Sequence, residues 1–489
     1  MRLNAKSISY QKLGRHRGST RLWIEGRKLE RAGIVPGQRF TMTWNQETGC
    51  VHLDFTAGDK GDRTVSKRMR GGREMPIVDI SANSLEEALG EGIERAKITI
   101  SPGSITVEIH PHDQASKERI QRLSERVASG EPLLTGSLAH GAGILDHAIH
   151  TGLEDQGVAA RLAFAVEIDA DILDAAASNN PIWDADTLQI QGGMQEAEAA
   201  SLPKVDILVA GLPCTGASKA GKAKNHNPLT EDHPEAGALF VAFLRVVECT
   251  NPSVVILENV VDYAHSASAA VIRAAFTTWG YEVHETVLEG NAFGALEDRK
   301  RLCMVAVSPQ LEIDLANLVP TRNKEETLGE ILEDIDPESD LWKEYKYLVE
   351  KAIKDATKGS NFKPNVVGPE ATKIGAIGAG YSKVRQTEAK VRHPSDPKKM
   401  RLLTPKEHAA VKTVPANLVE NLGWTLAHTV LGNSVTWAAW RSVGRLLGDA
   451  ANNLAEFESF TVDASALPEA VERIEFAFDE RTPDQMKMF

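Results

Sequence analysis

The sequence is poor in cysteine and has no long apolar run. Its 489 residues include only four cysteines, and none of them forms a C-x-x-C pair or stands at zinc-finger spacing. We therefore expect no disulfide framework and no metal site. No apolar run reaches the roughly eighteen residues of a membrane span, and none near Met1 resembles a signal peptide. These absences predict a cytoplasmic protein, without a membrane partner, whose reduced thiols include one available for catalysis.

The chain also lacks an excess of positive charge, since its 55 Lys and Arg are outnumbered by 68 Asp and Glu. This balance at first argues against a nucleic-acid partner, because phosphate binding depends on Lys and Arg. The formal net charge is -13. However, residues 1–74 contain 16 Lys or Arg against seven Asp or Glu, and residues 371–406 contain nine against two. Either segment could be a solvated face. Whether these two basic segments bind nucleic acid therefore depends on the motifs that accompany them.

Changes of pattern along the chain predict several domains. Residues 1–112 carry short strand patterns separated by Pro-Gly turns, which predicts a small, basic, β-rich domain. Its expected strands include Arg39–Trp44, Val51–Phe55, Lys97–Ile100 and Ile105–Ile109. The polar segment 113–130 ends in a glycine and predicts a helical linker.

Apolar strands alternate with helices over residues 131–310, a pattern that predicts an α/β domain with a largely parallel sheet. Its expected strands are Leu162–Val166, Val205–Ala210, Ser253–Leu257, Glu282–Leu288 and Leu302–Val307. Residues 311–400 interrupt this alternation with an acidic, helical stretch (Lys324–Lys358) and then a Gly-rich basic one, which predicts an insert. Residues 401–450 return to amphipathic helix, and 451–489 form an acidic tail.

Four reactive side chains stand where strands of this sheet end or begin. Cys214 follows the strand Val205–Ala210 in a Gly/Pro-containing loop, and Glu258 follows the next apolar strand. Arg299 and Arg301 precede a third strand. Loops at strand ends are where ligands bind in α/β sheets, and exposure there can activate a thiol. Taken singly, a free loop cysteine, a solvated carboxylate and a basic surface turn remain alternatives.

Together, five segments in this order resemble the motifs of the DNA cytosine-5 methyltransferase family. The matching segments are Pro213-Cys214, Glu258-Asn259-Val260, Glu297-x-Arg299-x-Arg301, Arg401-x-Leu403-Thr404-x-x-Glu407 and Gly432-Asn433-Ser434-Val435. Thr215 and Glu297 stand where the family has Gln. The resemblance implies a Rossmann-like sheet that uses S-adenosyl-L-methionine, with an inserted target-recognition domain at 311–400 and double-stranded DNA as the partner.

The resemblance also implies a mechanism. The Cys214 thiolate would add to carbon 6 of a cytosine flipped out of the duplex. Glu258 would bond the ring N3 and the exocyclic amine, and Arg301, with Arg299 nearby, would hold the base carbonyl. An RNA cytosine-5 methyltransferase and a catalytically silent DNA-binding regulator with the same fold are the alternatives.

Cofactor contacts follow from the same resemblance. The loop Gly136–Gly143 is similar to the family's Gly-rich opening loop but lacks its Phe and one Gly. Glu167 matches the acid that holds the ribose hydroxyls, and Asp186, with Asp184 as its rival, resembles the acid near the adenine amine. The expected cofactor-binding residues are Gly141, Gly143, Glu167, Asp186, Pro213 and Asn433.

Basic segments predict the DNA contacts. Within the insert, Gly378–Arg385 combines glycines with cations and is the expected reading loop, although a mobile surface loop is the alternative. The expected DNA contacts are Ser218, Tyr381, Lys383 and Arg385. A partner restriction endonuclease is an open alternative, and we expect a nucleoid-associated protein of a bacterium or phage.

The N-terminal segment Arg21–Gln38 resembles the small swapped-hairpin domains of SymE-like and AbrB-like proteins. That resemblance implies DNA affinity through phosphate contacts and allows a homodimer through this module. The expected phosphate contacts are Lys67, Arg68, Arg70 and Arg73. A structural cap on the catalytic domain is the alternative.

Overall fold

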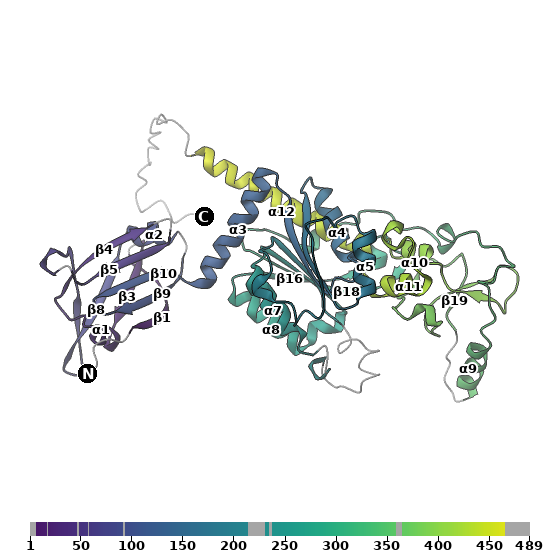
Figure 1. The fold of residues 1–489 in the computed structure, drawn as a ribbon, viewed down its shortest axis with the longest axis horizontal. Coiled ribbons are helices and arrows are strands. Elements are labelled where there is room, and N and C mark those ends of the chain that lie inside the picture. The colour runs from purple at the N-terminus through teal and green to yellow at the C-terminus, as the bar shows by residue number, and fades with distance from the viewer. Residues whose placement is uncertain are drawn as a thin grey trace, which may run out of the picture.

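The computed structural model has an N-terminal β domain, a central α/β domain and a smaller lobe, arranged in this order along its length (Figure 1). The described residues are 6–16, 18–45, 48–56, 58–90, 93–213, 230–233, 237–357 and 364–464. Cys214, Ser218 and the segment 465–489 lie outside them. Within these ranges, none of the helices is long and apolar enough to cross a membrane.

The N-terminal domain consists of two antiparallel sheets with the orders β1-β9-β10-β5-β4-β6 and β2-β3-β8-β7. Its elements are β1 (Ser7–Lys12), β2 (Gly14–His16), β3 (Ser19–Glu25), α1 (Arg27–Arg31), β4 (Arg39–Asn45), β5 (Cys50–Asp54), β6 (Arg63–Thr64), β7 (Ser66–Arg70), β8 (Arg73–Ser81), α2 (Asn83–Leu89), β9 (Arg95–Ser101) and β10 (Ser104–Ile109). Alternating apolar residues of these strands form one core between the sheets.

This domain contains two copies of one strand-helix-strand-strand unit. The first unit is β3-α1-β4-β5 and the second is β8-α2-β9-β10. The units pair with each other through β3 with β8 and through β5 with β10, both antiparallel. Leu29 of α1 and Leu85 of α2 are both completely buried. Each unit therefore completes the sheets of the other within a single chain.

Helix α3 (Pro111–Ser129) connects this domain to the next and occupies most of the expected linker. It ends at Gly130, which adopts the left-handed conformation that favours glycine. Arg119 of this helix is buried, donates to the Ser308 hydroxyl at 2.7 Å and lies over the Tyr281 ring. The helix is thus packed on the central domain rather than exposed as a spacer.

The central domain confirms the predicted α/β class. Its sheet has the order β13-β12-β11-β14-β15-β18-β16, with β18 antiparallel to both neighbours and the other strands parallel to one another. The strands are β11 (Leu133–Leu138), β12 (Ala160–Glu167), β13 (Leu188–Gln191), β14 (Ile207–Gly211), β15 (Val254–Asn259), β16 (Glu282–Glu289) and β18 (Lys300–Val307).

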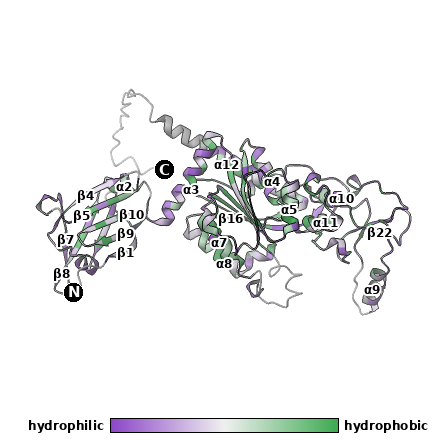
Figure 2. Ribbon diagram, in the orientation of Figure 1, coloured by the Kyte–Doolittle hydropathy of each residue, from purple (hydrophilic) through white to green (hydrophobic). Residues whose placement is uncertain are grey.

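Helices cover both faces of this sheet. One face packs against α3, α4 and α12, and the other packs against α7 and α8. The flanking helices are α4 (Ile144–Glu154), α5 (Ala170–Asn179), α7 (Leu239–Thr250), α8 (Ala267–Thr278) and α12 (Trp437–Ala464). Figure 2 shows hydrophobic residues concentrated in the sheet and in the helix faces against it. Burial on both faces explains the continuous apolar runs of the strands.

The smaller lobe has little regular structure and its own small core. Its elements are β17 (Glu297–Asp298), α9 (Lys346–Thr357), β19 (Val366–Val367), β20 (Ile374–Gly375), β21 (Lys390–Arg392), β22 (Met400–Arg401), α10 (Pro405–Val411) and α11 (Trp424–Asn433). The predicted helix over Lys324–Lys358 is wrong for most of its length, since only α9 is an α-helix and turns with one short 3-10 segment (Leu328–Glu330) precede it. At the other end of the chain, the expected tail begins as a continuation of α12.

Candidate active site

The carboxyl ends of β11 to β15 and the start of β18 lie along one edge of the sheet, here called the catalytic edge. Glu258, next to last in β15, and Arg301, second in β18, meet there. The Arg301 Nε atom lies 2.8 Å from Glu258 Oε1, and the side chains are 17% and 14% exposed. Arg301 also donates to the carbonyl of Lys300 at 2.8 Å. The structure therefore joins two of the predicted catalytic residues in an ion pair.

The second oxygen of Glu258 faces the end of β14. A Cβ atom built on Gly211 would lie 3.7 Å from Glu258 Oε2. Asn259 is buried and donates its side-chain amide to the carbonyl of Leu212 at 3.1 Å, which fixes the chain where it leaves β14. Two residues later comes Cys214. The Glu258 carboxylate is thus directed to the base of the loop that carries the predicted nucleophile.

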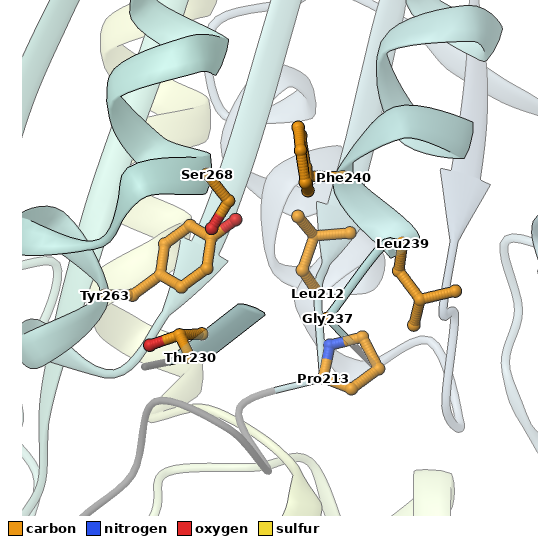
Figure 3. A pocket seen from close by; sticks show the side chains of 8 residues that line it. All are labelled: Leu212, Pro213, Thr230, Gly237, Leu239, Phe240, Tyr263 and Ser268. Atoms are coloured by element: carbon orange, nitrogen blue, oxygen red, sulfur yellow. The ribbon is translucent and has the colours of Figure 1, made fainter. Parts of the chain in front are cut away.

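A small hollow lies beside this loop base (Figure 3). Leu212 and Pro213, the two residues after β14, line it and face Tyr263 and Ser268 from the segment that follows β15. Pro213 is exposed. Its expected role at the cofactor stays a prediction.

Two other cysteines are unsuited to nucleophilic chemistry. Cys303 lies in the middle of β18, is completely buried, and has its thiol pKa raised by burial and by the Glu258 carboxylate. Cys50 belongs to the N-terminal domain, and burial also raises its pKa. Since the thiolate is the reactive form, neither competes with Cys214 for this role.

Arg299 points away from the place expected for the base. It is 5% exposed, and its guanidinium donates to the carbonyls of Ile377 at 3.2 Å and of Gly432 at 3.1 Å. These contacts tie together the insert and the end of α11. The guanidinium of Arg299 thus binds buried backbone carbonyls in these contacts, and its expected place near Arg301 at the base carbonyl stays a prediction.

Glu167 organises the cofactor end of the catalytic edge. Its Oε2 accepts from the backbone N–H of Gly141 at 2.8 Å, and its Oε1 accepts from those of Ile168 and Asp169. Gly141 has a φ of 58°, and nothing lies within 4 Å of a Cβ atom built on it. Ile168, directly after Glu167, is 68% exposed. A carboxylate, an open backbone turn and an exposed apolar side chain thus lie together at the carboxyl ends of the neighbouring strands β11 and β12.

His140 is a site residue that the sequence analysis missed. It is buried, with Nδ1 2.9 Å from Ser137 Oγ and 3.2 Å from Asp146 Oδ2, and its Nε2 accepts from Trp183 Nε1 at 3.2 Å. A Cβ atom built on Gly143 would lie 2.5 Å from this Nε2. Gly143 is therefore required by packing against His140, whereas its contact with a cofactor stays a prediction.

The assignments of Asp186 and Asp184 to the adenine amine are wrong. Both residues precede β13, at its amino end, and Asp186 is exposed with its carboxylate 3.9 Å from Arg161. Asp184 accepts from the backbone of Asp186 and from a neighbouring hydroxyl. At the carboxyl end of β13, beside Glu167, stand Gln191 and Gly192 instead, and Gly192 N–H donates to the carbonyl of Glu167 at 2.9 Å.

The predicted reading loop divides into a buried and an exposed part. Tyr381 is completely buried, and its hydroxyl donates to the carbonyl of Ala389 at 2.6 Å and accepts from Leu403 N–H at 2.9 Å. Its predicted DNA contact is therefore contradicted, because both its ring and its hydroxyl are used by the core of the lobe. Lys383 and Arg385 are exposed and stay candidates.

The last two motifs are structural in their described contacts. Arg401 is buried and forms a two-point ion pair with Glu407, at 2.6 and 2.7 Å, while Thr404 caps α10 together with Glu407. Asn433 is the exposed last residue of α11. It follows Gly432, to which Arg299 donates, and its role at the cofactor stays a prediction.

Comparison with known proteins agrees with this arrangement. Residues 135–448 match the family model of C-5 cytosine-specific DNA methylases. The type II methyltransferase M.MspI of Moraxella sp is 29% identical over 252 residues, which are 50% of this chain and 56% of that protein. M.NlaX of Neisseria lactamica is 28% identical over 261 residues, which are 52% of this chain and 79% of that protein. The chain thus spans little more than half the length of M.MspI.

Solved structures show the same fold. The crystal structure of the S. pombe Dnmt2 methyltransferase superposes with a TM-score of 0.51 at 18% identity, and the match covers 65% of this chain and 99% of that chain. At this level of identity the likeness concerns the fold alone.

Proposed function

This chain belongs to the C-5 cytosine-specific DNA methylase family, and on that premise we propose that it transfers a methyl group from S-adenosyl-L-methionine to carbon 5 of cytosine in DNA. The observation that carries the proposal is the pairing of Glu258 with Arg301 at the catalytic edge, directed to the loop base before Cys214. A carboxyl group oriented in this way can bind the polar edge of a base that is presented to a thiol.

The chemistry needs activation of a weakly nucleophilic carbon. In the proposed reaction the Cys214 thiolate forms a bond to carbon 6 of cytosine, and the ring electrons move to carbon 5, which then takes the methyl group. Glu258 bonds N3 and the exocyclic amine of the base, which stabilises the adduct as it forms. The carbon 5 proton is then lost to water, the electrons of its bond re-form the double bond between carbons 5 and 6, and the Cys214 thiolate leaves carbon 6.

Arg301 supplies the orientation of that carboxyl group. It bonds Oε1 of Glu258 and leaves Oε2 directed to Gly211. The cytosine must leave the base stack to reach such a buried edge, and unstacking costs a few kcal/mol that new contacts in the pocket offset. An RNA cytosine with the same edges is the alternative substrate.

Residues at the cofactor end fit S-adenosyl-L-methionine. When bound, this cofactor supplies the methyl group. Glu167 would accept hydrogen bonds from the ribose hydroxyls, the open backbone at Gly141 allows close approach of the ligand, and Ile168 offers an apolar surface to the adenine ring. This fit favours an active enzyme over the silent regulator.

Methyl transfer with a labelled donor tests the proposal directly. We expect incorporation into duplex DNA, with 5-methylcytosine as the product, and little incorporation into structured RNA. Mapping 5-methylcytosine in the DNA of an expression host would also give the recognised sequence. Incorporation into RNA alone would favour the RNA enzyme, and no incorporation into either would favour the silent regulator.

We further propose that the N-terminal domain adds duplex affinity. The hairpin formed by β7 and β8 carries the four expected cations, and the residues of β7 are exposed. Lys67 and Arg68 form exposed ion pairs with Glu74 at 2.5 Å and Glu25 at 3.5 Å. Arg70 and Arg73 flank the turn, where they can reach phosphates. Because the two repeated units already pair with each other, this role needs no second chain.

A further inference from the structure

We infer that the buried ion pair between Glu297 and Lys412, together with Arg299, positions the target-recognition lobe on the catalytic edge. This inference rests on the proposed function. Both Glu297 and Lys412 are completely buried, and Lys412 Nζ lies 2.7 Å from Glu297 Oε2. The pair connects the segment before β18 with the segment after α10. It therefore links parts of the chain that are more than a hundred residues apart.

The other oxygen of Glu297 holds the insert. Its Oε1 accepts from the backbone N–H of Ile377 at 2.7 Å, while the carbonyl of the same residue accepts from Arg299. In addition, β17 pairs with β20, so the backbone on both sides of Glu297 is in contact with the insert. Both polar groups of Ile377 are thus fixed by side chains of the motif that also carries Arg301.

The same contacts fix the start of the reading loop. Gly378 directly follows Ile377, and a Cβ atom built on Gly432 would lie within 2.2 Å of the Gly378 and Ala379 backbone. Arg299 bonds the carbonyl of Gly432. Gly432 and Ile377 therefore hold Gly378 from both sides, five residues before the exposed Lys383.

Charge explains why a carboxylate stands at position 297. A glutamine has one acceptor oxygen, whereas Glu297 uses one oxygen for Ile377 and the other for Lys412. Burial works against ionisation of Glu297, but Lys412 and Arg299 outweigh it and lower the pKa of the carboxyl. Burial, reinforced by Arg299, lowers the pKa of Lys412 to about 7. The Glu297 carboxylate is thus shared by two cations, and as the pH rises Lys412 loses its charge before Arg299 does.

Isosteric variants test the inference in the full chain. In Glu297→Gln the single acceptor oxygen cannot serve both partners, so we expect faster hydrogen exchange in peptides covering residues 374–380, measured without DNA or cofactor. For the methylation reaction we expect KM for DNA to rise and discrimination against mismatched sites to fall by about 10- to 100-fold, with KM for the methyl donor unchanged. Combining Glu297→Gln with Lys412→Met removes the competing donor and should restore both readouts.

A matched control separates positioning from stability. Asp206 is also completely buried and also bonds both a backbone N–H, that of Leu134, and a cation, Arg122, but it lies at the opposite end of the sheet. Asp206→Asn should lower the unfolding temperature as Glu297→Gln does. It should leave exchange at residues 374–380 and site discrimination unchanged.

The pH dependence gives an independent readout. Lys412 faces Glu297, Arg299, Arg301 and His408. In the wild type, site discrimination should decline as the pH rises through about 7, where Lys412 loses its charge. This step should be absent from Lys412→Met, move to lower pH in Glu297→Gln, and stay unchanged in Asp206→Asn.

Defined outcomes overturn the inference. If Glu297→Gln only loses stability, as the control does, with wild-type exchange at 374–380 and wild-type discrimination, the pair is structural and the inference fails. Absence of methyl transfer by the wild type would refute the proposed function instead, and the exchange experiment would still decide whether the pair positions the insert.

Discussion

Replacing Arg301 with alanine removes the side chain that orients the proposed catalytic carboxyl group. Glu258 would keep its place in β15, because the strand is paired on both sides. Its side chain would lose the ion pair that holds Oε1 2.8 Å from Arg301 Nε. The carboxyl group would then sample several rotamers, and only some of them would meet the cytosine edge.

The size of the effect follows from the loss of that orientation. A misplacement of about 1 Å in a reacting group can cost about 100-fold in rate, and the low exposure of both side chains limits screening of the ion pair by solvent. We therefore expect kcat to fall about 100-fold, which corresponds to about 2.7 kcal/mol. KM for the methyl donor should stay unchanged, because Glu167 ends β12 and Gly141 lies in the turn after β11, both outside the strands that carry Glu258 and Arg301.

Steady-state methylation of duplex DNA by Arg301→Ala and by Lys300→Ala measures this effect. Lys300 is the preceding residue, and its ammonium group pairs with Glu289 of β16 at 2.6 Å, away from Glu258. Its replacement removes the same charge and should leave kcat within about twofold of the wild type, as surface pairs contribute little. Equal losses in the two variants, or wild-type turnover by Arg301→Ala, would refute the orientation argument.

Three further predictions concern the thiol and the DNA contacts. Cys214→Ala should abolish methyl transfer and also the covalent complex that the wild type forms on DNA with 5-fluorocytosine, which denaturing gels detect; an adduct in the variant would assign the nucleophile elsewhere. Arg385→Ala should weaken DNA binding or change the methylated sequence, and an unchanged affinity and sequence would leave this loop a plain surface. Replacing Arg70 and Arg73 with serine should reduce the slope of log affinity against log salt by about 2, at about 0.9 per phosphate contact, and an unchanged slope would remove the N-terminal domain from DNA binding.

The sequence predicted the strands and the Glu258 and Arg301 positions because the relevant signals are local. Apolar runs such as Ser253–Leu257 mark strands that are buried on both faces, and polar residues at their ends must lie at the sheet edge. The pairing of Glu258 with Arg301 depends only on β15 and β18 being neighbours.

The failures come from signals that were ambiguous or absent. The acids at 184 and 186 stand beside a strand, but sequence alone did not decide that β13 begins after them rather than ending before them. Tyr381 lies among glycines, which indicates a loop, whereas its burial depends on Leu403 and Ala389. The absence of a helix before α9 could have been predicted locally, since Pro337 interrupts the acidic stretch and disfavours a helix there.

The altered glycine loop was the reason for considering a silent protein, and its geometry weakens that reason. His140 occupies the loop without filling the ligand side, because Ser137, Asp146 and Trp183 hold its ring inside the domain. Gly141, the next residue, keeps its positive φ, its bond to Glu167 and an open side. A bulky residue that is held inward therefore preserves the turn that a ligand would approach. Calorimetry should accordingly detect binding of S-adenosyl-L-methionine by the wild type and no binding by Glu167→Ala. Equal binding by both proteins would mean that the cofactor does not use this edge.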